Sequence, residues 1–94
     1  MDTGEDVMNI KLYTGPSCLA CKALKTRLHL LGLENFYTEC DTGEEEHREA
    51  IMALGFRSIP VLVYYNDNGV MLDTLAGNLA KDSDYEEFFK GGYA

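Results

Sequence analysis

The stretch Thr14-Gly15-Pro16-Ser17-Cys18-Leu19-Ala20-Cys21 decides the fold, because a turn-forming tetrapeptide separates two segments of different periodicity and leads into two cysteines three positions apart. Before it, Val7 to Tyr13 alternates well enough for a β-strand. After it, apolar residues recur every three or four positions as far as Leu31, as in an amphipathic helix. Cys18 is therefore expected at the first turn of that helix.

The two thiols predict redox chemistry. Cysteines at this spacing can form a small disulfide ring, open it on the disulfide of another protein, and so carry two electrons without a bound cofactor. The unpaired N–H groups and the dipole at the start of the helix favour the thiolate of Cys18. Cys21 lies one turn further in and is expected to be more shielded. We assign Cys18 as the attacking nucleophile and Cys21 as the thiol that resolves the mixed disulfide.

Composition predicts a single domain over residues 1–94, with short flexible tails at about 1–6 and 91–94. Sixteen Asp and Glu residues against eight Lys and Arg give a net charge of −8, which opposes binding to nucleic acid or to an anionic membrane. The acidic start carries no signal-peptide pattern, and the odd number of cysteines does not suggest a disulfide scaffold. A monomer in the reducing cytoplasm is therefore expected.

The rest of the chain predicts two further helices and three further strands. Thr42-Gly43-Glu44-Glu45 has the spacing of a capping box, and the helix after it should run to about Leu54 with Gly55 as its stop. Asp82-Ser83-Asp84 can cap a last helix. The further strands are expected at 35–40, 61–65 and 70–75, the last two joined by a turn at 66–69.

This order of elements implies an α/β architecture. Strands joined through a helix are expected to be parallel neighbours, whereas the two strands around the 66–69 turn must be antiparallel. A four-stranded mixed sheet in the order β-α-β-α-β-β-α, flanked by three helices, results. The proline of Ile59-Pro60 precedes the third strand, where a cis bond can be kept.

Together these features resemble the glutaredoxin branch of the thioredoxin fold, and within it the NrdH-redoxins most of all. The resemblance runs from Met8 to about Lys90 and rests on the Cys18–Cys21 segment and on Gly55-Phe56-Arg57-Ser58-Ile59-Pro60-Val61. It implies a thiol–disulfide oxidoreductase of cell redox homeostasis whose only redox group is the Cys18–Cys21 disulfide, with no other cofactor and no metal. It also implies that Pro60 is cis and that its loop lies against the dithiol, where the backbone around Ile59 pairs with a partner.

Departures from the family patterns bear on the electron source. Glutaredoxins proper usually have Pro-Tyr between the cysteines, where this chain has Leu19-Ala20, and a lysine where it has Gly15. The glycine pair that grips glutathione is reduced to Gly77 within Ala76-Gly77-Asn78. The resemblance therefore implies thioredoxin reductase or glutathione as reductant, the former better supported, and ribonucleotide reductase or another disulfide protein as acceptor.

Several residues carry more than one interpretation. Tyr13, Leu19, Ala20, Arg57, Ile59, Pro60 and Gly77 are candidate partner contacts. Tyr13 could equally pack in the core, and Arg57 could pair with an acid of its own chain. Cys40 is expected to be a buried small hydrophobe, and His47 a solvated neighbour of glutamates. A metal- or cluster-binding module using the three cysteines, and a redox-inert adaptor, remain as alternatives.

Overall fold

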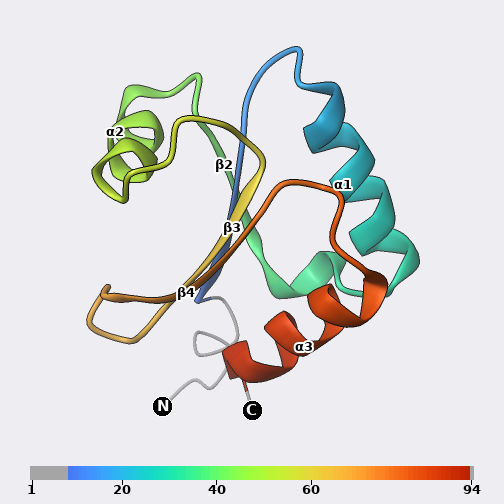
Figure 1. Ribbon diagram of the computed structural model, residues 1–94. Coiled ribbons are helices and arrows are strands. Elements are labelled where there is room, and N and C mark those ends of the chain that lie inside the picture. Colours follow the sequence, from blue (N-terminus) through green and yellow to red (C-terminus); the bar gives the residue numbers. More distant parts are fainter. Residues whose placement is uncertain (1–8, 94) are drawn as a thin grey trace.

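A computed structural model describes residues 9–93 and places the sheet at the centre of the molecule (Figure 1). The strands lie in the order β2-β1-β3-β4, with β1 parallel to β2 and antiparallel to β3, and with β3 antiparallel to β4. The elements are β1 (Ile10–Thr14), α1 (Leu19–Leu30), the short 3-10 helix η2 (Glu34–Phe36), β2 (Thr38–Asp41), α2 (Glu45–Ala53), β3 (Val61–Tyr65), β4 (Met71–Ala76) and α3 (Asp82–Tyr93). The expected mixed sheet with three α-helices is confirmed.

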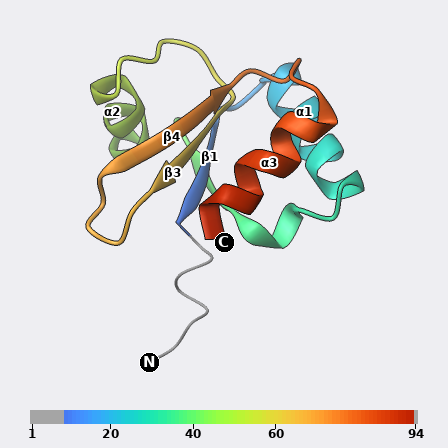
Figure 2. The same ribbon diagram turned by 60° about the horizontal axis from the view of Figure 1, so that its bottom comes forward.

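Helices cover both faces of the sheet, so the fold has three layers. Helix α2 lies on one face, and α1 and α3 lie together on the other (Figure 1 and Figure 2). Side chains alternate along a strand, so successive residues of β1 enter the two layers in turn. Leu12 belongs to the core under α1 and α3, and Tyr13 belongs to the core under α2.

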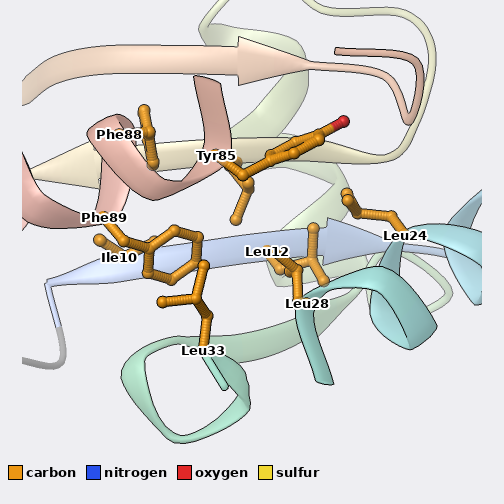
Figure 3. Packing of buried hydrophobic residues seen from close by; sticks show 9 residues of the cluster. Ile10, Leu12, Leu24, Leu28, Leu33, Tyr85, Phe88 and Phe89 are labelled. Atoms are coloured by element: carbon orange, nitrogen blue, oxygen red, sulfur yellow. The ribbon is translucent and has the colours of Figure 1, made fainter. Parts of the chain in front are cut away.

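The larger core forms between the sheet and the helices α1 and α3. Leucines of α1 and aromatic residues of α3 converge on the apolar side chains of β1 (Figure 3). Its buried members are Ile10, Leu12, Leu24, Leu28, Leu33, Leu62, Tyr85, Phe88 and Phe89. The smaller core, on the α2 side, contains Tyr13, Cys40, Ile51, Val61 and Val63. Burial of these two sets fixes α1 and α2 against opposite faces of the sheet.

Two local predictions are wrong. The segment expected as a strand from Asn35 begins with η2, and β2 starts only at Thr38. The Phe36 N–H donates to the Leu33 carbonyl, and Phe36 packs against the larger core. The capping box at Thr42 does not form: Glu44 is the residue before α2, no side chain caps the helix, and the Thr42 hydroxyl instead donates to the Thr14 carbonyl.

The turns and helix ends follow their local chemistry. Gly32, Gly55 and Gly69 all have positive φ, at the ends of α1 and α2 and in the hairpin turn. The Asn66 side chain accepts hydrogen bonds from the Asn68 and Val70 N–H groups, which closes the turn between β3 and β4. At the start of α3, the Asp84 carboxylate accepts from the Lys81 N–H. The stop at Gly55, the turn at 66–69 and a cap of α3 from the segment 82–84 were expected from the sequence and are confirmed.

Helix α3 continues through Tyr93, so residues 91–93, which belong to the flexible tail expected at the end of the chain, are helical. The N-terminal tail at 1–6, the start of the first strand at Val7, and Ala94 lie outside the described residues. Within residues 9–93, none of the helices combines the length and the apolar character needed to cross a membrane.

Replacing Leu28 by Ala tests the larger core. Leu28 is fully buried between α1 and β1, so the loss of its side chain should lower the free energy of unfolding by about 2–5 kcal/mol. Leu30→Ala, on the same helix but 77% exposed, is the matched control and should change it by less than about 0.5 kcal/mol. Urea denaturation followed by circular dichroism measures both, and equal effects would contradict the packing described.

Candidate redox site

The two cysteines of the motif form a disulfide at the start of α1, with 5.2 Å between their Cα atoms. Cys18 is the residue before the helix, in an extended conformation with φ −102° and ψ 104°. Its Sγ accepts a hydrogen bond from the Cys21 N–H at 3.1 Å. Ser17, with φ 58°, turns the chain into this position. The sulfur of Cys18 therefore lies where free helix N–H groups stabilise a thiolate after reduction.

The two sulfurs differ in access, as the sequence predicted. Cys18 is half-buried, whereas Cys21 is 2% exposed and lies on the side of α1 that enters the core. Leu19, between them, is 80% exposed, and Ala20 is half-buried. An incoming disulfide can thus reach Cys18 and meets an apolar side chain beside it. Cys21 is shielded from solvent and is bonded to the sulfur of Cys18.

The loop before β3 lies against the loop that carries the dithiol. The Ile59-Pro60 bond is cis, as expected, and Pro60 is buried. A Cβ at Gly15 would lie 2.5 Å from Cδ1 of Ile59, so the two loops are in close contact at this point. The Gly77 N–H donates to the Pro60 carbonyl at 2.8 Å, which attaches the segment after β4 to the same loop. Three segments far apart in the sequence are therefore joined at the loop that leads into the dithiol.

Hydrogen bonds at the end of β1 hold the dithiol loop in place. The Thr14 carbonyl accepts from both the N–H and the hydroxyl of Thr42, each at 2.7 Å. The Thr14 hydroxyl donates to Glu39 at 2.8 Å, and the Lys25 ammonium pairs with the same carboxylate at 3.0 Å. The sequence analysis did not predict that Thr14, Thr42 and Glu39 support the site. Only the parallel pairing of β1 with β2 brings their residues together.

Tyr13 is a core residue. Its hydroxyl hydrogen-bonds to the Tyr65 hydroxyl at 2.8 Å, and the ring is almost completely buried under α2. Burial and this hydrogen bond raise the pKa of Tyr13 well above its usual range, so the group stays protonated. Of the two interpretations of Tyr13, the structure favours core packing over contact with a partner.

The two remaining candidate residues, Arg57 and Gly77, differ in exposure. Arg57 is exposed, and Gly77 is half-buried with φ 83°. Leu79, which the sequence analysis missed, is 89% exposed in the segment between Gly77 and α3. In the sequence, Leu79 directly follows a glycine and an asparagine, in a stretch too short for either a strand or a helix. This context is the pattern from which an exposed leucine could have been predicted.

Cys40 and His47 lie on the α2 side of the sheet. Cys40 is buried in the smaller core, and burial raises the pKa of its thiol. His47 lies 3.6 Å from the Glu44 carboxylate. Within residues 9–93, no three His, Cys, Asp or Glu side chains are grouped so that they could hold a metal ion. Cys40 behaves as the buried hydrophobe expected from the sequence.

Comparison with known proteins agrees with this geometry. A family model described as Glutaredoxin matches residues 10–70. The search of curated proteins found no match. The NrdH-redoxin of Escherichia coli, described as a glutaredoxin-like protein with a thioredoxin-like activity profile, is 25% identical, with a TM-score of 0.63 over 85% of this chain and 93% of that one.

Solved thioredoxins also share the fold. Thioredoxin of Malassezia sympodialis superposes with a TM-score of 0.66 at 19% identity, over 95% of this chain and 77% of that chain. Mitochondrial thioredoxin 3 of Saccharomyces cerevisiae gives 0.65 at 18% identity, over 87% and 76% of the two chains. With the strand order β2-β1-β3-β4, these likenesses identify the thioredoxin fold.

The contact between the two loops predicts the effect of a methyl group at position 15. Gly15→Ala should lower the free energy of unfolding of the reduced protein by about 1–3 kcal/mol, because the new Cβ overlaps Cδ1 of Ile59. Ile59→Val removes Cδ1 and so relieves the overlap, and it is the second variant of the double-mutant cycle. The double variant should recover part of the loss in urea denaturation, and strictly additive effects would contradict the contact.

The burial of Cys40 predicts selective alkylation. In the reduced protein at pH 7, iodoacetamide should modify Cys18 first, because Cys40 is buried and its raised pKa keeps it in the unreactive thiol form. Since the shift is upward, Cys40 should stay unreactive until well above the pH at which an exposed cysteine ionises. Mass spectrometry with and without urea measures this. Cys40→Ala is the control, and rapid labelling of native Cys40 would refute the prediction.

Proposed function

This chain belongs to the glutaredoxin family of thiol–disulfide oxidoreductases, and on that premise we propose that it acts as an NrdH-type redoxin, a dithiol electron donor to protein disulfides. The contact between Gly15 and Ile59 carries the proposal. Glutaredoxins proper tend to carry a lysine at this position, where its charge meets a glutathione carboxylate. Here even a Cβ would displace Ile59, so the position favours a protein partner over glutathione.

The reaction follows from the difference between the two sulfurs. The Cys18 thiolate attacks one sulfur of the partner's disulfide, forming a mixed disulfide and releasing the partner's other sulfur as a thiolate, which takes up a proton. The thiolate of Cys21 then attacks Cys18 and releases the second sulfur. The partner gains two electrons and two protons, and the chain is left with the Cys18–Cys21 disulfide found in the structure.

The remaining assignments are part of the same proposal. Thioredoxin reductase supplies the two electrons that reopen the disulfide, and ribonucleotide reductase is the acceptor. No cofactor is bound, since the sulfur pair alone carries the electrons. The protein works as a monomer in the cytoplasm, and its net charge of −8 makes nucleic acid and anionic membranes unsuitable partners.

A glutathione-dependent glutaredoxin is the second candidate, because the matching family model is that of glutaredoxins. It would use the same Cys18 sulfur but form its mixed disulfide with glutathione. The two candidates differ in the source of electrons, which an assay can separate without knowledge of the physiological acceptor.

The proposed function predicts the preferred reductant. The oxidised protein is supplied with NADPH and thioredoxin reductase, or with NADPH, glutathione and glutathione reductase, and NADPH consumption is followed with insulin as acceptor. Turnover should be at least about tenfold faster in the first system, which corresponds to a preference of about 1.4 kcal/mol in transition-state binding. The reverse preference would favour a glutathione-dependent glutaredoxin.

Cysteine variants provide the control for this assay. Cys18→Ser should abolish turnover in both systems while the circular dichroism spectrum of the fold is retained. Cys21→Ser should stop reduction at the mixed disulfide, which mass spectrometry detects as a covalent adduct. Retained insulin reduction in Cys18→Ser would refute the assignment of the nucleophile.

A further inference from the structure

A groove of about 630 Å³ opens between α2 and the loop that leads to Pro60. It is lined by Thr42, Arg48, Ile51, Met52, Gly55, Phe56, Arg57, Ser58 and Ile59. Its volume falls within the range of about 300–1,000 Å³ that is usual for ligand clefts. The groove can therefore receive several side chains of a bound segment.

The charge of the groove is opposite to that of the chain. Its lining contains two arginines and no acid, although the chain has sixteen acidic residues and a net charge of −8. Arg48 donates to the Thr42 carbonyl at 3.4 Å, and among residues 9–93 neither Arg48 nor Arg57 forms a salt bridge. Of the glutamates near the start of α2, Glu44 pairs with His47. Two guanidinium groups thus remain available to carboxylates from another molecule.

The groove also offers apolar surface in addition to its two arginines. Ile51 is buried at its base, and Phe56 and Ile59 are half-buried. Met52 is 61% exposed, and its flexible side chain can adapt to different partners. An occupant that satisfies both features carries acidic residues together with an apolar one.

One end of the groove meets the dithiol loop. Thr42 and Ile59 line the groove and are also the two side chains that approach Gly15, at 3.1 and 2.5 Å from the position of a Cβ there. Gly15 is three residues before Cys18. The loop after α2 crosses to β3 at the same end of the sheet at which β1 leads into α1 (Figure 1). A segment that leaves the groove past Ile59 therefore arrives at the redox site.

We propose that this groove docks an acidic, extended segment of the protein whose disulfide the dithiol reduces. Carboxylates of the segment pair with Arg48 and Arg57, and an apolar side chain of the same segment packs on Met52 and Phe56. The inference rests on the proposed function and adds to it the chemistry by which a protein substrate is selected. It also accounts for two unpaired arginines in a strongly acidic chain.

The test compares two disulfide-containing peptides of equal length, one with glutamate and leucine flanking the disulfide and one with glutamine in place of each glutamate. The second-order rate constant for their reduction is measured with the reduced full-length protein. Arg48→Glu combined with Arg57→Glu should slow reduction of the glutamate peptide by about tenfold or more and change the glutamine peptide by less than about twofold. Arg48→Gln with Arg57→Gln should give an intermediate loss.

Two controls separate docking from general charge and from chemistry. Lys81→Glu with Lys90→Glu makes the same change in net charge at exposed residues outside the groove and should leave the peptide preference unchanged. Reduction of neutral 2-hydroxyethyl disulfide measures the chemistry of each variant alone, and each peptide rate is divided by it. A cysteine-free form of the glutamate peptide should shift the backbone ¹H–¹⁵N signals of Met52, Phe56 and Ser58 in the intact protein.

The outcomes distinguish the two proposals. Equal losses in the arginine and lysine variants, or an unchanged rate with the glutamate peptide, would overturn the docking site. A loss with glutathione disulfide as large as that with the glutamate peptide would reassign the groove to glutathione. Failure of the wild-type protein to reduce 2-hydroxyethyl disulfide would refute the redox function, and the peptide titration would then still decide whether the groove binds acidic segments.

Discussion

Burial of β1 on both faces is the constraint on which the rest of the structure depends. Ile10 and Leu12 enter one core and Tyr13 enters the other, so the strand can lie only at the centre of the sheet, with helices on both sides. Its end then lies where β2, the loop before β3 and the segment after β4 converge. The position of Cys18 beside these segments is a consequence of where β1 ends.

The central position of β1 also explains why so few polar contacts suffice to place the site. The Thr14 carbonyl takes two hydrogen bonds from Thr42, and the Thr14 hydroxyl is bonded to Glu39. These bonds join β1 to β2 and to the start of α2 at the base of the dithiol loop. The next residue, Gly15, approaches both Thr42 and Ile59, so the same loop also meets the segment before β3.

The fold and the two reactive cysteines could be predicted because their signals are local. Periodicity reveals α1, the asparagine and glycine residues reveal the hairpin after β3, and the spacing of Cys18 and Cys21 needs no tertiary information. Where the predictions were wrong, contacts between residues far apart in the sequence determined the local structure. Phe36 packs in a core formed by α1 and α3, which draws its segment into η2, and Thr42 bonds to Thr14 instead of capping α2. The groove was not predicted for a different reason: its lining residues all lie between Thr42 and Ile59, but only the path of the chain from α2 to Pro60 arranges them around one space.

The close approach of Gly15 to Ile59 has a consequence for how such a site can change over time. A side chain at position 15 requires Ile59 to move, and Ile59 directly precedes the cis proline of its loop. A lysine at position 15 would attract a small anionic thiol. Its introduction therefore requires substitutions both at position 15 and at Ile59, in two separate segments. Between them lies an intermediate with a damaged loop contact. A change between a protein reductant and glutathione as the source of electrons is therefore difficult by single substitutions, because the site has no room for one methyl group at position 15.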